Sequence, residues 1–402
     1  MKKTLFTILL QPIAAVIASI SPIIDQASNS QKLFFADFVN KLIFGYVYQV
    51  SSLRNLSLEL KTNSMCRALG LDFTPFSTLK DGFSRFESKH FKQLFESVLA
   101  QTNLCRVPSL DEIGVFRVID GSFFPTLLSM TWTSYRKTKN AFKWHLSFEL
   151  NRMIPTEFWV GKGNSNERKF LERVLEAGIT YIADRGYFSF ALADKVMPAQ
   201  AFFVFRGRDN LLYRVLEKSV IKHEELPACF KQVTDEIIIF TGDEKQNKVR
   251  LISFTVAGSY FRLMTNRFDL TTLKVIIIYA YRWQIELFFK FVKRTMDGIH
   301  LLNHSQNGVE IQFYVLMMVA ILMLKLKQAS QKLKKEAEKE AKKKAIAKAK
   351  SKEKSRNPSE WIKDIAKVFY KSWKISKNWL IAVKNSLAQV ADYEILKMLN
   401  AF

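Results

Sequence analysis

A run of charged and aromatic side chains beyond residue 278 has the composition needed to bind phosphates and metal ions. The segment reads YAYRWQIELFFKFVKR, from Tyr279 to Arg294. At about 100° per residue in a helix, five of its polar side chains would lie within about 80° of arc, opposite an apolar side that can be buried. They are Tyr279, Arg282, Glu286, Lys290 and Lys293. Glutamate and lysine four residues apart also stabilise ordinary surface helices, so spacing alone leaves a functional and a structural interpretation open.

Two aspartates lie where the pattern predicts that strands end. GVFRVIDGSFF is a strand-like run that ends at Asp120 before a glycine, and ITYIADRGYF contains a second strand that ends at Asp184. The carboxyl ends of neighbouring strands meet at one edge of an α/β sheet, where active sites gather. We therefore expect Asp120 and Asp184 to lie close together, with Glu286 supplied by a later helix.

The elements that must position these carboxylates change character along the chain. Residues 34–99 are helical and basic, and they predict either a helix-turn-helix-like DNA reader or an ordinary helical bundle. After Pro108 strands alternate with a helix at 165–178. From about 202 to 270 the pattern is almost purely β, and the apolar run at 311–324 predicts a buried helix.

The charge balance indicates a polyanionic partner. The 402 residues include 61 lysines and arginines against 37 aspartates and glutamates, a net charge of +24. The Lys/Ala/Glu-rich run at 329–356 carries +8 of this and the remaining residues +16, so the excess is not confined to that run. Such basicity is typical of proteins that bind nucleic acid or an acidic membrane surface.

The cysteines and histidines indicate neither a disulfide framework nor a metal site. Cys66, Cys105 and Cys229 show no CxxC spacing, and the five histidines do not cluster. A reducing, cytoplasmic compartment fits best. The apolar stretch near the N-terminus resembles a secretory signal, but Gln11 and Pro12 interrupt it and favour an amphipathic helix. The run at 311–324 is shorter than the roughly 20 residues that a membrane span requires.

The three carboxylates and their settings resemble the DDE transposases of bacterial insertion sequences. The closest branch has the signature Tyr, two residues, Arg, three residues, Glu, six residues, Lys. Tyr279, Arg282, Glu286 and Lys293 match it without a gap, and Lys290 is a further match. DRGYF after the second aspartate and MTN before the signature are also similar. The resemblance covers roughly residues 34 to 326.

The resemblance implies an RNase H-like fold, a mixed sheet flanked by helices and interrupted by a β-rich insertion. The pattern of elements follows the same order. The predicted parts are an N-terminal helical, DNA-binding domain, a catalytic domain with an insertion at about 200–271, a linker or helix, and a C-terminal helical region that could dimerise. Their predicted bounds are 1–108, 109–328, 329–356 and 357–402.

The resemblance also implies a chemistry. Asp120, Asp184 and Glu286 would hold two Mg²⁺ ions, for which Mn²⁺ would substitute, and the enzyme would cut DNA at the element's ends and join the freed 3′-hydroxyls to target DNA. The tyrosine, arginine and lysines of the signature would bind the phosphates beside the scissile bond. The implied partners are the terminal inverted repeats, the target DNA and a second copy of the chain, at the bacterial nucleoid and away from membranes.

Some positions leave alternatives open. Certain family members stack an insertion tryptophan on an extruded base, and this chain has no tryptophan between Trp159 and Trp283. Phe203, Phe205 or Tyr213 could stack instead, although packing in a buried strand is the simpler explanation for each of them. Arg206 and Arg208 are either DNA contacts or part of a solvated turn. A catalytically inactive or domesticated copy that only binds DNA is the alternative function.

Overall fold

The described residues of the protein, taken from a computed structural model, fall into two compact units. One unit holds the described residues up to 102 and those from Phe291 to 322, and the other holds those from 107 to Lys290. The described ranges are 5–29, 31–102, 107–126, 130–136, 139–221, 226–227, 229–295 and 301–322. The predicted parts at 329–356 and 357–402 lie outside them.

The second unit is organised around one ten-stranded mixed sheet. Its path runs β2-β3-β1-β5-β6-β10-β9-β8-β7, and β4 pairs with β3 off this path. The strands are β1 (Val115–Pro125), β2 (Ser134–Arg136), β3 (Lys139–Glu149), β4 (Ile154–Lys162), β5 (Ile179–Ala183), β6 (Phe202–Arg206), β7 (Tyr213–Lys218), β8 (Lys231–Phe240), β9 (Val249–Val256) and β10 (Ser259–Thr265).

The centre of this sheet is parallel and its flanks are antiparallel. β5 pairs in parallel with both β1 and β6, whereas β3 pairs antiparallel with β1 and β4. β5 is buried along its whole length, as expected for a strand covered on both faces. The arrangement is consistent with an RNase H-like fold. β7 to β10 continue the same sheet, because β10 pairs with β6.

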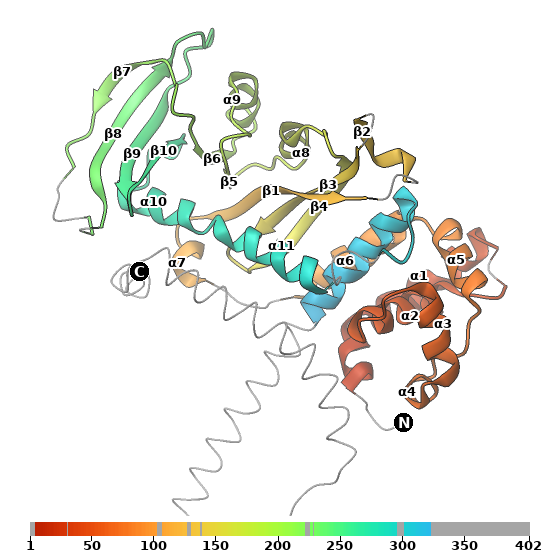
Figure 1. The fold of residues 1–402 in the computed structure, drawn as a ribbon. Coiled ribbons are helices and arrows are strands. Elements are labelled where there is room, and N and C mark those ends of the chain that lie inside the picture. The colour runs from red at the N-terminus through yellow and green to blue at the C-terminus, as the bar shows by residue number, and fades with distance from the viewer. Residues whose placement is uncertain are drawn as a thin grey trace, which may run out of the picture. The chain divides into compact units, whose positions relative to one another are not determined.

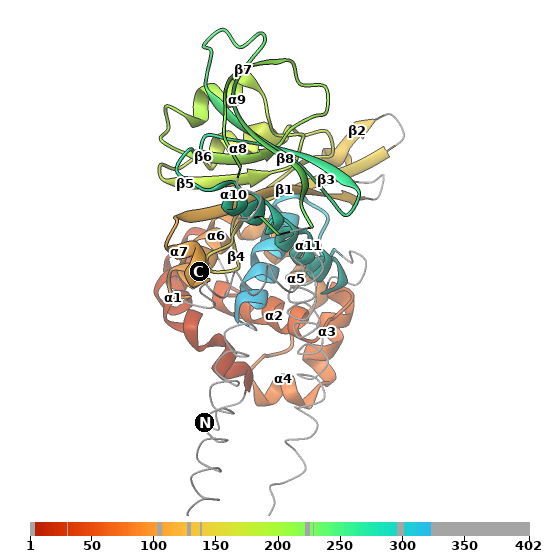
Figure 2. The same ribbon diagram turned by 90° about the vertical axis from the view of Figure 1, so that its left-hand side faces the viewer.

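Helices cover both faces of the sheet (Figures 1 and 2). On β3, Trp144 packs 5.2 Å from Phe289 of α11, whereas the next residue, His145, packs 5.7 Å from Phe170 of α8. Successive side chains of a strand point to opposite faces, so α8 and α11 cover different faces. The helices of this unit are α7 (Pro108–Asp111), the 3₁₀ turn η1 (Thr131–Thr133), α8 (Glu167–Arg173), α9 (Phe190–Val196), α10 (Thr272–Ala280) and α11 (Trp283–Thr295).

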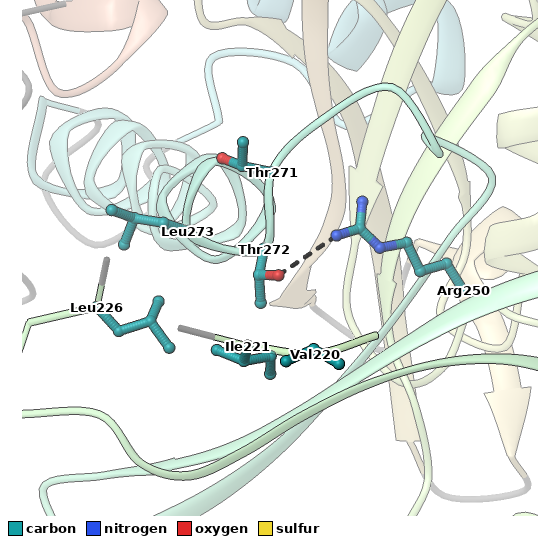
Figure 3. Close-up of a pocket in the computed structure, with 7 residues that line it drawn as sticks. All are labelled: Val220, Ile221, Leu226, Arg250, Thr271, Thr272 and Leu273. Carbon is teal, nitrogen blue, oxygen red and sulfur yellow. Dashed lines mark hydrogen bonds between the residues drawn. The ribbon is translucent and has the colours of Figure 1, made fainter. Parts of the chain in front are cut away.

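A buried ion pair ties the β-rich part of the sheet to the start of α10. Arg250 on β9 donates to both carboxylate oxygens of Asp235 on β8, at 2.9 and 2.6 Å. The Thr272 hydroxyl donates to Asp235 at 2.6 Å, and Arg250 reaches the same threonine (Figure 3). Arg250 also donates to the backbone oxygens of Arg267 and Leu270. The entry to α10 is therefore fixed by hydrogen bonds from two strands.

The segment from Tyr279 to Arg294 is not one continuous helix, contrary to the prediction. α10 ends at Ala280, and α11 begins at Trp283. Between them the hydrogen bonds span three residues, as in Arg282 N to Tyr279 O at 2.9 Å. This tighter turn replaces the regular α-helical pattern, so the positions of Tyr279 and Arg282 do not follow one helical wheel.

The first unit is a helical bundle with an aromatic core. Phe38 meets Phe83 and Phe86 at centroid distances of 5.1 and 5.5 Å, and Phe35 meets Phe91 at 5.2 Å. Its helices are α1 (Leu5–Ala27), α2 (Phe35–Val47), α3 (Leu53–Thr62), α4 (Ser64–Ala68), α5 (Phe76–Arg85), α6 (Ser88–Ala100) and a further helix at 306–322.

Two predictions about apolar segments can be compared with this bundle. α1 buries Ile13, Ile17 and Ile24 while Ile23 is 71% exposed, which confirms an amphipathic helix. Residues 311–322 of the predicted apolar helix are buried, which confirms that prediction for the part inside the described residues. Across those residues, no helix combines the length and apolarity needed to cross a membrane.

Candidate active site

The register of the sheet brings Asp120 and Asp184 to the same level. Val118 of β1 is paired in parallel with Ile182 of β5, so two residues further on Asp120 and Asp184 stand side by side. β5 ends at Ala183, and Asp184 therefore leaves the sheet at this point. The structure thus places Asp120 on β1 and Asp184 directly after the end of the neighbouring strand β5.

Asp120 does not lie at the end of its strand, and this part of the prediction was wrong. β1 continues to Pro125, because β3 keeps pairing with it from Arg117↔Glu149 to Pro125↔Ala141. Only the parallel pairing with β5 stops near the aspartate. Asp120 therefore lies where the pairing of β1 with β5 has ended and its pairing with β3 continues.

Arg282 lies between carboxylates from different elements. Its guanidinium is 2.8 Å from Glu286 and 3.9 Å from Asp120. The Tyr279 hydroxyl donates to Asp184 at 3.4 Å. The turn between α10 and α11 thus brings Asp120, Asp184 and Glu286 around one buried arginine.

The electrostatics of this cluster indicate a shortage of positive charge. Burial, with a smaller contribution from the negative charges of Glu286 and Glu167, raises the pKa of Asp120 to about 6, against the opposing effects of the Gly121 amide and Arg282. Burial also raises the pKa of Tyr279 to about 12. Burial opposes the charge on Arg282, but the surrounding tyrosine and carboxylates outweigh it and raise its pKa. An additional cation would relieve the repulsion at Asp120.

The carboxylate oxygens of Asp120, Asp184 and Glu286 suit a hard divalent cation, but in this structure they surround Arg282 instead. Carboxylate oxygens are the ligands that Mg²⁺ prefers. Among the described residues, no three acidic, histidine or cysteine side chains stand in a geometry ready to hold a metal ion. The Nε atom of Arg282 is buried and has no hydrogen-bond partner within that same set. Arg282 thus supplies the positive charge at this place, with part of its hydrogen-bonding capacity unused.

Three further polar residues next to Asp120 were not predicted as part of a site. Lys143 on β3 pairs with Glu167 at the start of α8. The Tyr187 side chain is buried, and its hydroxyl has no hydrogen-bond partner among the residues the structure describes. Tyr187 stands in the DRGYF motif, whereas neither Lys143 nor Glu167 stands in a recognisable motif.

The predicted DNA-contacting cations differ in exposure. Lys290 is exposed on α11, one turn beyond Glu286, and Lys293 is half-buried on the same helix, where burial lowers its pKa. Arg206, at the end of β6, lies over the ring of Phe261 at 4.5 Å and is close enough to Tyr279 to influence its pKa. Arg208 is exposed. Arg206 is therefore the insertion arginine that lies near the candidate site.

The aromatic residues that could stack on a base differ in exposure. Phe203 and Phe205 are each 1% exposed and stack on each other at 5.0 Å, so packing explains both. Tyr213 is half-buried, with Arg262 at 5.9 Å from its ring. Trp283 is 41% exposed. Of these four side chains, Tyr213 and Trp283 present surface that a base could contact.

Comparison with known proteins places the chain in a family. The model of the family described as the transposase DDE domain matches residues 113–322, more than half of the chain. The chain therefore belongs to the DDE transposase family. The matched range ends beyond Lys293, the last residue of the signature, and includes all three carboxylates of the candidate site.

Individual relatives carry names of the same kind. A protein named as transposase y4zB from Sinorhizobium fredii is 25% identical over 216 residues, 52% of this chain and 60% of that protein. A probable transposase for insertion sequence element IS5377 from Geobacillus stearothermophilus is 21% identical over 268 residues, 65% and 70% of the two chains. A transposase named for insertion sequence element IS4SA from Synechocystis is 25% identical over 279 residues, 67% and 77%. The chain matches less than two thirds of the first relative's length.

Asp120→Asn is expected to raise the thermal midpoint of the metal-free protein at about pH 7.5. The Asp120 carboxyl loses its proton near pH 4 in the unfolded state and near pH 6 in the folded state. The stability that the neutral carboxyl confers is therefore lost as the pH rises from about 4 to about 6. A neutral amide avoids the loss, which amounts to at most about 3 kcal/mol. Thermal unfolding at about pH 4 and 7.5 checks this, and a mutant no more stable than the parent at the higher pH would contradict it.

Proposed function

We propose that the chain is an active transposase that cuts DNA at the ends of its element and joins the freed 3′-hydroxyls to target DNA. The observation that carries this proposal is the gathering of Asp120, Asp184 and Glu286 around Arg282. Phosphoryl transfer needs little covalent chemistry from the protein and depends on positioning and charge. A half-buried carboxylate cluster beside phosphate-binding cations would meet both needs.

Asp120, Asp184 and Glu286 would hold the divalent ions, physiologically Mg²⁺. When bound, two such ions supply a nucleophile from water or a 3′-hydroxyl and stabilise the departing oxygen of an in-line displacement. The protein's own task is to fix the carboxylates: β1 and β5 set the two aspartates by their register, and α11 presents the glutamate. Strands and a helix hold these carboxylates more precisely than loops would.

Arg282 would exchange partners during the reaction. Without DNA it neutralises Glu286 at 2.8 Å. A DNA phosphate offers the guanidinium a bidentate partner of the same kind, which would leave the Glu286 carboxylate available to hold a divalent ion. Tyr279, Lys290 and Lys293 would bind further phosphates, with Arg206 approaching from the insertion and Arg208 beyond it.

We also propose that the first unit binds the terminal repeats and that the active assembly contains two copies of the chain. The helices α3 to α5 carry basic side chains against aromatic rings, with Arg54 at 4.9 Å from Phe76 and Lys61 at 5.9 Å from Phe73. Phe73 is 52% exposed. Cationic and aromatic groups together suit a nucleic-acid surface.

Lys290→Ala is expected to weaken binding to DNA ends uniformly across sequences and to reduce the slope of log affinity against log salt by about one. Its ammonium is exposed and would contact phosphate rather than a base. Fluorescence anisotropy over a salt series measures this. Lys245→Ala, which removes an exposed lysine paired with Asp194 at 3.4 Å, serves as the control, and equal slopes for both variants would refute the phosphate contact.

Cleavage of DNA that carries the inverted repeats flanking the gene tests the proposed function. The full chain should nick such ends with Mg²⁺ or Mn²⁺ and not in a chelator, and it should then join them to a second DNA. Specific binding without cleavage under any divalent ion would favour the inactive, DNA-binding alternative. An absence of both would refute the proposal.

A further inference from the structure

A fourth carboxylate approaches the candidate site from the other face of the sheet, at the place where the pairing between β1 and β5 has stopped. Glu167 begins α8, and its charge contributes to the raised pKa of Asp120. One of its oxygens, Oε2, lies 2.8 Å from the place where a Cβ on Gly186 would stand. Gly186 follows Asp184 by two residues, beyond the end of β5. The Glu167 carboxylate therefore lies over the turn that carries the second aspartate.

Lys143 holds this glutamate in place. Its ammonium donates to Oε1 of Glu167, which leaves Oε2 free of that bond. The lysine stem crosses Gly121, where an added Cβ would come within 2.7 Å of the lysine Cε. A glycine next to Asp120 thus makes room for the lysine that fixes Glu167.

A buried hydroxyl points to a missing partner at the same place. Tyr187 is 1% exposed, and its hydroxyl has no hydrogen-bond partner within the described part of the chain. Burial and the charges of Asp120, Glu167 and Asp184 raise its pKa well above the ordinary value. A buried hydroxyl without a partner is destabilising, so a donor placed among carboxylates indicates a water or ligand between them.

The charges around Asp120 also leave room for a cation. Four carboxylates, those of Asp120, Glu167, Asp184 and Glu286, lie around the cations of Arg282 and Lys143, and Arg168 donates to the backbone oxygen of Gly186 at 3.3 Å. A divalent ion would add positive charge among these carboxylates. Mg²⁺ keeps several of its waters when protein carboxylates bind it, and those waters need acceptors and donors of their own.

We propose that Glu167 and Tyr187 extend the cation site. Glu167, held by Lys143, and the Tyr187 hydroxyl bind water molecules in the hydration shell of the cation that Asp120 and Asp184 hold. Both are positioning residues, because they act on the cation through water. The inference rests on the proposed function, since it assigns these residues to the same cation site.

Mn²⁺ titration of the full chain by calorimetry tests this inference. Glu167→Gln is expected to weaken Mn²⁺ binding about tenfold or more, the usual effect of losing an outer-shell partner. Tyr187→Phe should weaken it in the same direction while removing only one oxygen. In cleavage assays both variants should need more metal ion but approach the parent rate at saturating metal, which a merely structural defect would not produce.

The control is Glu172→Gln on the same helix, whose carboxylate pairs with Lys195 at 2.6 Å. It should bind Mn²⁺ like the parent. Parent affinity in Tyr187→Phe and in every folded Glu167 variant would overturn the inference. Asp184→Asn separates the two proposals: if it loses Mn²⁺ binding while the Glu167 and Tyr187 variants keep it, only the outer residues are wrongly assigned. If Asp184→Asn keeps full Mn²⁺ binding, the site itself is wrongly assigned.

Discussion

Asp184→Asn is expected to reduce metal-dependent cleavage of DNA ends by about a thousandfold or more. Metal ions contribute several kcal/mol of transition-state stabilisation, and each 1.36 kcal/mol or so is a factor of ten in rate. The amide keeps the shape of the side chain and can still meet the Tyr279 hydroxyl, which lies 3.4 Å from the carboxylate. Single-turnover cleavage with Mg²⁺ measures the change.

Binding and a nearby control separate catalysis from folding in this experiment. Asp184→Asn should bind end DNA about as well as the parent, because the phosphate-binding cations are unchanged. Asp209→Asn removes an exposed carboxylate that pairs with Arg185 at 3.1 Å, and it should cleave within a few-fold of the parent. Cleavage at the parent rate by Asp184→Asn would reject the assignment of the aspartate.

Asp235→Ala is expected to lower the free energy of unfolding by about 3–5 kcal/mol, because it leaves the Arg250 guanidinium buried without its carboxylate. Asp235 is 2% exposed and accepts from Arg250 twice and from Thr272 once. Since Thr272 begins α10, the change should also reduce cleavage by misplacing Tyr279 and Arg282. Urea unfolding measures the stability.

An exposed ion pair provides the comparison. Glu96 pairs with Lys92 at 3.6 Å, and the two side chains are 57% and 39% exposed, so Glu96→Ala should cost no more than about 1 kcal/mol. A loss below about 1 kcal/mol for Asp235→Ala as well would show that the buried pair does not secure α10.

Sequence patterns identified the residues of the site better than they predicted where the strands and helices around them begin and end. The signature from Tyr279 to Lys293 and the two aspartates were visible because spacing along the chain specifies them. The end of β1 was misplaced because a glycine after an aspartate is typical of a strand end, whereas pairing with β3 decides where the strand stops. The break before Trp283 was missed because its residues also fit a helical period.

Glu167 and Lys143 could not be found from the sequence at all. They meet because β3 pairs with β1 and places Lys143 opposite Phe123, while α8 lies over that face. Such pairing is non-local, and no spacing rule connects a lysine on one strand to a glutamate 24 residues later. The short helix α9 was not predicted from the sequence either.

A crystal structure of the full chain with end DNA and Mn²⁺, read by anomalous scattering, tests the central claim most directly. We expect manganese bound by Asp120, Asp184 and Glu286, and the Arg282 guanidinium moved from Glu286 to a DNA phosphate. Bound DNA with no manganese at these carboxylates, and with Arg282 still paired to Glu286, would contradict the account.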